Sequence, residues 1–245
     1  MESFSRRFAR FIFGKVMPRT AYPVVSGPLK GARFVLGSLS GEGGGASVYF
    51  DRMESEQTAA MLGEIGTGSV FFDIGANVGY YSILASRLAG PTGRIAAFEP
   101  LIRNLAYLQR HVEINGADNV QVLPFAISSD NSIVSFSTGA DSAMGHLDAE
   151  GDGDMLVPTV TLDEISDRLG LVPDVIKIDV EGAEMDVFRG GARVLAAKPT
   201  IFLSTHSDEL RLECLELLKG LGYSVTSLLK DEDSHEFIAR FPRSE

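Results

Sequence analysis

Acidic side chains follow several short apolar runs, at the places where buried strands would end. Asp73 ends the first such run, Glu99 follows the second, Asp179 ends the fourth, and His206 lies just beyond the fifth. In open α/β sheets, ligands bind beyond the carboxyl ends of the parallel strands, where the strand order reverses. We therefore expect these side chains to converge on one cleft, whose carboxylates suit a ligand that carries hydroxyl groups and positive charge.

The turn after the first run contains two glycines, in Asp73-Ile-Gly-Ala-Asn-Val-Gly-Tyr80. Gly75 and Gly79 allow a tight turn and let a ligand approach the backbone. A dinucleotide-binding turn has the pattern Gly-x-Gly-x-x-Gly, in which the second glycine makes room for the pyrophosphate. Asn77 takes that second place here, which favours a ligand without phosphate. S-adenosylmethionine (SAM), which carries a sulfonium and an ammonium group, is such a ligand.

Glu99 lies 20 residues beyond Gly79, where a carboxylate can accept hydrogen bonds from both hydroxyls of a ribose. Leu101 would then flank the adenine ring, with Phe125 or Ala126 on its other side. The cofactor-binding residues predicted in this way are Asp73, Gly75, Asn77, Gly79, Glu99, Leu101, Phe125, Ala126 and Asp179.

Apolar runs alternate with helical patterns from residue 69 onward, as in the βαβ units of a parallel sheet. The chain closes with two runs on either side of 231–234, which predicts an antiparallel hairpin added to that sheet. We therefore predict an α/β fold with a doubly wound, mostly parallel, Rossmann-like sheet of seven strands. The expected strands are 70–74, 94–98, 120–123, 175–179, 200–204, 223–230 and 235–240.

The front of the chain differs from the rest in charge. Residues 1–33 carry seven basic groups and one acid. We expect residues 1–50 to form a basic helix and a small β and loop cap, followed by the Rossmann-like domain at 51–245. The basic helix is expected either to dock on that domain or to make weak peripheral contact with a membrane or partner.

Composition excludes several classes of function. A net charge of −11 argues against a large nucleic-acid surface, because phosphate binding requires clustered lysine and arginine. The single cysteine, Cys214, excludes an internal disulfide and a multi-cysteine zinc site. The sequence has neither a signal-peptide pattern nor an apolar stretch long enough to span a bilayer. We expect a cytoplasmic protein without a metal; its oligomeric state is not determined by the sequence.

Three motifs together resemble the FkbM family of methyltransferases, over roughly residues 48–206. They are the turn at 73–80, the sequence Phe98-Glu-Pro100, and the most distinctive one, Ile176-Lys-Ile-Asp-Val-Glu-Gly-Ala-Glu184. The resemblance implies a class I methyltransferase fold, SAM as methyl donor, and O-methylation of a sugar, polyketide or other small metabolite. Family members commonly have a glutamate two residues before the histidine of the fifth strand. This chain has Ser204 there, although His206 is retained.

Methyl transfer to a hydroxyl group requires alignment of the acceptor oxygen with the methyl–sulfur bond, and a general base helps. His206, Asp179, Glu181 and Glu184 are the candidates, and His206 has the most suitable ordinary pKa. Lys177 is expected in a buried strand, where an ammonium group requires a partner. It would either pair with a carboxylate, Asp179 or Asp73, or orient the acceptor.

Two other interpretations remain open from the sequence: a nicotinamide-dependent oxidoreductase on a similar sheet, and a binding module without catalytic activity. A magnesium site made by Asp179 with Glu181 or Glu184 is a further, less favoured alternative. The cap and an insertion at 139–157 would determine the acceptor, and the acidic segment 148–154 within this insertion is expected to be a mobile loop on the acceptor side. His111 and His235 are expected at the surface.

Overall fold

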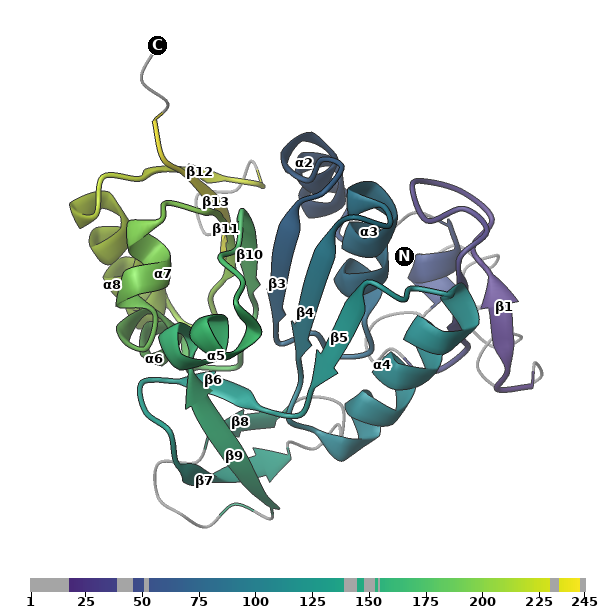
Figure 1. Cartoon of the computed structure of the whole chain (residues 1–245), viewed down its shortest axis with the longest axis horizontal. Helices are drawn as coiled ribbons and strands as arrows, with labels where there is room; N and C mark the ends of the chain where they lie inside the picture. Colours follow the sequence, from purple (N-terminus) through teal and green to yellow (C-terminus); the bar gives the residue numbers. More distant parts are fainter. Residues whose placement is uncertain are drawn as a thin grey trace, which may run out of the picture.

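A seven-stranded sheet forms the centre of the computed structural model (Figure 1), in the order β12-β13-β11-β10-β3-β4-β5. The strands from β11 to β5 are parallel, whereas β13 is antiparallel to both β11 and β12. The predicted fold, including the antiparallel hairpin, is confirmed. The strands are β3 (Val70–Ile74), β4 (Arg94–Phe98), β5 (Val120–Leu123), β10 (Val175–Ile178), β11 (Thr200–Ser204), β12 (Ser224–Ser227) and β13 (Glu236–Arg240).

The structure describes residues 18–38, 46–50, 53–138, 145–147, 153, 155–229 and 234–242. The expected basic helix at the start of the chain, the turn of the C-terminal hairpin and most of the 139–157 insertion lie outside these residues.

Helices cover both faces of the central sheet (Figure 1). Side chains of α2 (Ser55–Glu64), α3 (Tyr80–Ala89) and α4 (Ile102–Asn115) share a core with one face. Side chains of α5 (Leu162–Leu169), α6 (Glu184–Arg189), α7 (Ala192–Ala196) and α8 (Asp208–Gly220) share a core with the other. Alternate residues of one strand enter different cores: Phe71 packs with α2 and α3, whereas Phe72 packs with the second group. This alternation follows from the pleat of a β-strand.

The described part of the front segment packs into the first core. It contains the antiparallel pair β1 (Ala21–Pro23) and β2 (Arg33–Val35) and the short helix η2 (Ala46–Phe50). The backbone N–H of Val35 donates to Nε2 of His111, whose Nδ1 lies 2.7 Å from the carbonyl oxygen of Val78. His111 is completely buried, so its expected surface position is wrong. The reason is that β2 covers the α4 face that a lone helix would expose.

A second sheet, which the sequence did not predict, lies beside the end of β4 (Figure 1). Its strands run in the order β6-β9-β7-β8. The buried side chains of Leu101, Phe136 and Val157 form a small core there. β8 and the start of β9 fall within the 139–157 insertion, whereas the segment 148–154, which is expected to be a mobile loop, lies almost entirely outside the described residues. The strands are β6 (Ala126–Ser128), β7 (Ile133–Thr138), β8 (Gly145–Leu147) and β9 (Met155–Thr161).

Candidate active site

The turn between β3 and α3 approaches the ends of both neighbouring strands. The backbone N–H groups of Gly75 and Ala76 donate to the carbonyl oxygen of Phe98, at 3.0 and 2.9 Å. Gly75 has φ +79°, and a Cβ atom on it would lie 1.9 Å from the carbonyl oxygen of Asp179. Only glycine fits here, because the conformation is left-handed and a backbone atom occupies the space of a side chain.

Glu99, immediately after β4, is held by the turn. Its carboxylate accepts hydrogen bonds from the backbone N–H groups of Asn77, at 2.8 Å, and Leu101, at 2.9 Å. Its exposed fraction is 4%. Burial raises the pKa of Glu99 to about 7, although the two backbone hydrogen bonds oppose that shift. The carboxylate is therefore oriented by the backbone and can change its charge near neutral pH.

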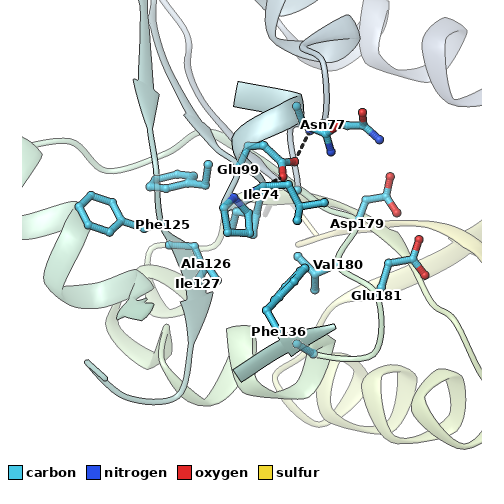
Figure 2. A pocket seen from close by; sticks show the side chains of 16 residues that line it. Ile74, Asn77, Glu99, Phe125, Ala126, Ile127, Phe136, Asp179, Val180 and Glu181 are labelled. Carbon is cyan, nitrogen blue, oxygen red and sulfur yellow. Dashed lines mark hydrogen bonds between the residues drawn. The ribbon is translucent and has the colours of Figure 1, made fainter. Parts of the chain in front are cut away.

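A pocket of about 690 Å³, including its open mouth, lies beyond these strand ends. Figure 2 shows the aromatic ring of Phe125 at one end and the carboxylates of Asp179 and Glu181 at the other, with Glu99 between them. The Oδ1 atom of Asn77, which also lines the pocket, is buried without a hydrogen-bond partner among the described residues. The lining residues are Ile74, Gly75, Asn77, Phe98, Glu99, Pro100, Leu101, Asn104, Phe125, Ala126, Ile127, Phe136, Asp179, Val180, Glu181 and Ala183.

Most of the residues predicted to bind the cofactor line this pocket, and two do not. Asp73 is completely buried beneath the pocket, where Ser82 Oγ donates to its Oδ2 at 2.6 Å. Gly79 immediately precedes α3, and a Cβ atom there would lie 2.5 Å from a methyl carbon of Leu108 on α4. The predicted residues that line the pocket are Gly75, Asn77, Glu99, Leu101, Phe125, Ala126 and Asp179.

Sequence reasoning missed Asn104 and Phe136 as lining residues. Asn104 lies in the first turn of α4 and is buried, which is unusual for an asparagine in an amphipathic helix. Its spacing of three residues from Leu101 and four from Leu108 puts a polar side chain on the apolar face of the helix, and this was the available signal in the sequence. Phe136 belongs to the second sheet and reaches the pocket through tertiary packing, so nothing local in the sequence places it there.

Lys177 pairs with Asp179 rather than with Asp73. Its Nζ donates to Asp179 Oδ2 at 2.8 Å, and its side chain is only 3% exposed. The ammonium also lies 5.2 Å from the ring centroid of Tyr81. Burial would lower the pKa of Lys177, but the carboxylates of Asp179, Asp73 and Glu54 outweigh burial and hold it above its ordinary value. The charged lysine in turn keeps the pKa of Asp179 low against the effect of burial.

His206 faces three carboxylates. Its Nδ1 lies 2.7 Å from Oε1 of Glu184, and its Nε2 lies 3.6 Å from Asp179 Oδ1 and 3.5 Å from Glu181 Oε2. The hydrogen bond to Glu184 raises the pKa of His206 to about 9, and the charges of Glu181 and Asp179 add to this. The imidazole is therefore protonated at neutral pH in this state, which makes it a hydrogen-bond donor rather than a base.

Two further carboxylates, Glu54 and Glu236, lie on the same side of the sheet as Lys177. Glu54 precedes α2 in a left-handed conformation with φ +42°, and the hydroxyl of Tyr81 donates to its carboxylate. Glu236 begins β13 and lies opposite Ser204 of β11. Ser204 Oγ donates to Glu236 Oε2 at 2.9 Å. Ser204, at the position where the resemblance to the FkbM family implies a glutamate, thus contacts a carboxylate on the adjacent strand.

The strand order of the central sheet, the glycine turn after β3 and the oriented carboxylate after β4 define a class I SAM-dependent methyltransferase. The Methyltransferase FkbM domain matches residues 73–225, and the chain belongs to this family. It is therefore a SAM-dependent methyltransferase, and the oxidoreductase and the non-catalytic binding module are no longer tenable.

Two relatives carry specific names. The chain is 28% identical over 188 residues to a hexuronic acid methyltransferase, AglP, of Haloferax volcanii, covering 74% of this chain and 75% of the relative. It is 28% identical over 193 residues to a 2-O-methyltransferase, NoeI, of Sinorhizobium fredii, covering 71% of this chain and 75% of the relative. Among solved structures, a methyltransferase FkbM from Methylobacillus flagellatus has a TM-score of 0.52 at 20% identity. That match covers 70% of this chain and 43% of the other chain, so it supports the fold alone.

The described residues bear on membrane insertion and on metal binding. The helices in this part of the chain are too short or too polar to cross a membrane. Within the same residues, histidine, cysteine and acidic side chains do not form a group of three or more that could hold a metal ion.

Proposed function

We propose that this enzyme transfers the methyl group of SAM to a hydroxyl group of a sugar or another small metabolite. The names of the two relatives, a hexuronic acid methyltransferase and a 2-O-methyltransferase, favour a sugar. The observation that carries the proposal is the position of Asp179. Its carboxylate lines the pocket, and it also contacts Lys177 and approaches His206. Asp179 thus lies between the cofactor pocket and a second polar cluster, which contains Lys177 and His206 and is suited to an acceptor.

The pocket residues fit SAM. The apolar walls formed by Leu101, Phe125, Ala126 and Phe136 suit the adenine ring, and Glu99 can accept hydrogen bonds from the ribose hydroxyls while the backbone fixes its orientation. Beyond Glu99, the unpartnered Oδ1 of Asn77 and the carboxylate of Asp179 suit the ammonium group of the amino-acid end.

When bound, SAM supplies a methyl group on a positively charged sulfur atom. The chain's contribution is then to position an acceptor oxygen in line with the methyl–sulfur bond, which can lower the barrier by about 7–11 kcal/mol at best. Lys177 holds Asp179 in its charged form and fixes the orientation of its carboxylate. His206, protonated and anchored by Glu184, can donate from Nε2 to an acceptor oxygen. We retain Asp179, Glu181, His206 and Lys177 as the proposed catalytic residues.

The test is methyl transfer from SAM with a labelled methyl group to a panel of sugars. The panel contains the methyl glycosides of glucose, galactose, fucose and N-acetylglucosamine and the corresponding uronic acids. We expect one or more products whose mass has increased by one methylene group and whose label is lost on cleavage of an O-methyl ether. Binding of SAM without transfer to any member of the panel would contradict the proposal.

The remaining proposals concern location and partners. We propose a cytoplasmic location, which fits the single free cysteine, Cys214, buried in α8. We also propose that the chain does not bind nucleic acid, because its net charge is −11. Cell fractionation and a salt-dependent binding assay with duplex DNA and RNA test these two proposals.

A further inference from the structure

The first residue of β13 lies at the catalytic edge of the sheet. β13 runs antiparallel to β11, so the start of β13 lies at the same edge as the end of β11, and Glu236 is directly opposite Ser204. Side chains of directly opposed residues point to the same face of a sheet. Phe202, two residues before Ser204, and Ile238, two residues after Glu236, belong to the core beneath α2 and α3. Ser204 and Glu236 therefore point to the face that also carries Lys177.

Ser204 orients the carboxylate of Glu236 but uses only part of its capacity to accept hydrogen bonds. Ser204, which is 6% exposed, donates one hydrogen bond to Glu236 Oε2. The side chain of Glu236 is half-buried, so it has limited contact with water. A carboxylate has about four acceptor sites on its two oxygens, and this hydrogen bond uses one of them. Glu236 can therefore accept a further hydrogen bond from a ligand.

Charged groups from two other parts of the chain act on Glu236. Lys177 acts on it from β10 and Asp179 from the position directly after β10, and Glu54 acts on it from the position before α2. Burial raises the pKa of Glu236 to about 7, and the negative charges of Asp179 and Glu54 contribute to the increase. Ser204 and the ammonium of Lys177 oppose it. A carboxylate in this state can take up a proton near neutral pH, as an efficient general base must.

The other candidate bases in this cluster are less suitable. Asp179 is paired with Lys177 and has a lowered pKa, which makes it a weak base. His206 is already protonated at neutral pH, because its pKa is raised to about 9. Glu184 is completely buried and its Oε1 is engaged with His206, so an acceptor cannot reach it directly.

We propose that Glu236, held in place by Ser204, binds the hydroxyl group of the methyl acceptor and accepts its proton. This inference rests on the proposed function. In the step, the acceptor oxygen forms a bond to the methyl carbon while the carbon–sulfur bond breaks and leaves its electron pair on sulfur. The hydroxyl proton passes to a carboxylate oxygen of Glu236, which later releases it to water. The alternative is a purely structural contact that ties β13 to β11.

The first test is Glu236→Gln, which keeps the size of the side chain and can still bond to Ser204. We expect kcat on an accepted sugar to fall by roughly 10²–10⁴-fold, the usual contribution of a general base. At saturating SAM, where the pH dependence of SAM binding has no effect, kcat/KM of the wild type for the sugar rises with pH through about 7, and this increase disappears in the variant. SAM affinity by calorimetry changes less than about twofold, because Glu236 does not line the cofactor pocket. Binding of the sugar in the presence of S-adenosylhomocysteine becomes weaker. Glu216→Gln, at an exposed position on α8, is the matched control and leaves all these values unchanged.

The second test moves the carboxylate across the strand pair. Glu236→Ser alone removes the base, whereas Glu236→Ser combined with Ser204→Glu returns a carboxylate to the same place from β11. We expect the double variant to recover about tenfold or more of the activity lost in Glu236→Ser. If the contact between Glu236 and Ser204 is purely structural, Glu236→Ser lowers the thermal stability rather than kcat. The double variant then restores the thermal stability but does not change kcat.

The outcomes separate this inference from the proposed function. If the wild type methylates a sugar and Glu236→Gln retains its kcat and its pH profile, Glu236 is structural and the inference is overturned while the function stands. If the wild type binds SAM but methylates no sugar in the panel, the proposed function fails, and the role of Glu236 fails with it.

Discussion

The imidazole of His206 lies 2.7 Å from the carboxylate of Glu184, whose side chain is completely buried. This contact joins the end of β11 to the first residue of α6. It fixes the ring so that Nε2 faces Asp179 and Glu181. Glu184, which the sequence suggested as one of several bases, is therefore better described as a positioning residue for His206.

Glu184→Gln should lower the pKa of His206 from about 9 toward its ordinary value of 6.5, because the charged hydrogen-bond partner is the largest cause of the increase. Glu181→Gln is the control and should lower it less, since Glu181 acts through charge from 3.5 Å. The measurement is an NMR titration of the imidazole proton, assigned with His206→Asn. If the imidazole of His206 titrates with the same midpoint in Glu184→Gln and in the wild type, Glu184 is not the main cause of its raised pKa.

The shifted pKa of His206 also affects stability. A folded pKa raised above the unfolded value stabilises the protein fully below pH 6.5, and this stabilisation is lost as the pH rises through about 9. The free energy of unfolding of Glu184→Gln should therefore vary less than that of the wild type between these two pH values. Urea unfolding at several pH values measures the difference.

Glu99→Ala should weaken SAM binding by about 1–3 kcal/mol, or roughly 5–150-fold, because hydrogen bonds to the ribose are lost. Calorimetry measures the change. Glu113→Ala, at an exposed position on α4, is the control and should leave the dissociation constant unchanged. An unaltered constant in Glu99→Ala would refute the assignment of Glu99 to the ribose.

SAM affinity should also depend on pH through Glu99. Its pKa is about 7, and ribose hydroxyls donate to the charged form, so binding should weaken as the pH falls below 7. Glu99→Gln, which has no charge to lose, should remove most of this dependence. A pH profile of the same slope in both proteins would show that another group is responsible.

Lys177→Met should destabilise the protein by about 3–5 kcal/mol at pH 7, because it leaves the carboxylates of Asp179 and Asp73 without their buried cation. Without the lysine, the folded pKa values of both carboxyl groups should rise. Groups with a raised pKa favour folding at low pH, so the deficit should be smaller at pH 5 than at pH 7. Urea unfolding of this variant and of Lys219→Met, an exposed control on α8, tests both statements.

Gly75→Ala should cost much more stability than Gly182→Ala. Both glycines have a positive φ, +79° and +87°, so each substitution introduces a backbone strain of about 1–3 kcal/mol. The added Cβ at residue 182 meets nothing within 4 Å, whereas at residue 75 it would collide with the backbone of Asp179. The turn would then have to move away from β10, and SAM binding should be lost. Thermal unfolding measures the stability of both variants, and calorimetry measures their SAM affinity. If both variants lose the same amount of stability and affinity, the close contact between Gly75 and the backbone of Asp179 is not important.

The central sheet and the glycine turn could be predicted from the sequence. The expected strands at 70–74, 94–98, 120–123 and 200–204 agree with β3, β4, β5 and β11. The reason is local, because buried parallel strands are continuous apolar runs bounded by turns. The place of Glu99 was predictable for the same reason, since it follows directly from where β4 ends.

The contacts that join distant segments depend on the tertiary structure and could not be predicted from the sequence. The pattern Thr161-Leu-Asp-Glu164 is typical of a capping box, and Thr161 Oγ1 does accept from the backbone N–H of Glu164, but Asn131 rather than Glu164 accepts from the backbone N–H of Thr161. His111 is buried because β2 covers α4. Phe136 lines the pocket from the second sheet, which no local sequence pattern predicted. Glu236 meets Ser204 because the register between β13 and β11 brings together residues 32 positions apart. Strand register depends on the packing of a whole sheet face, so a single sequence carries no local signal for it.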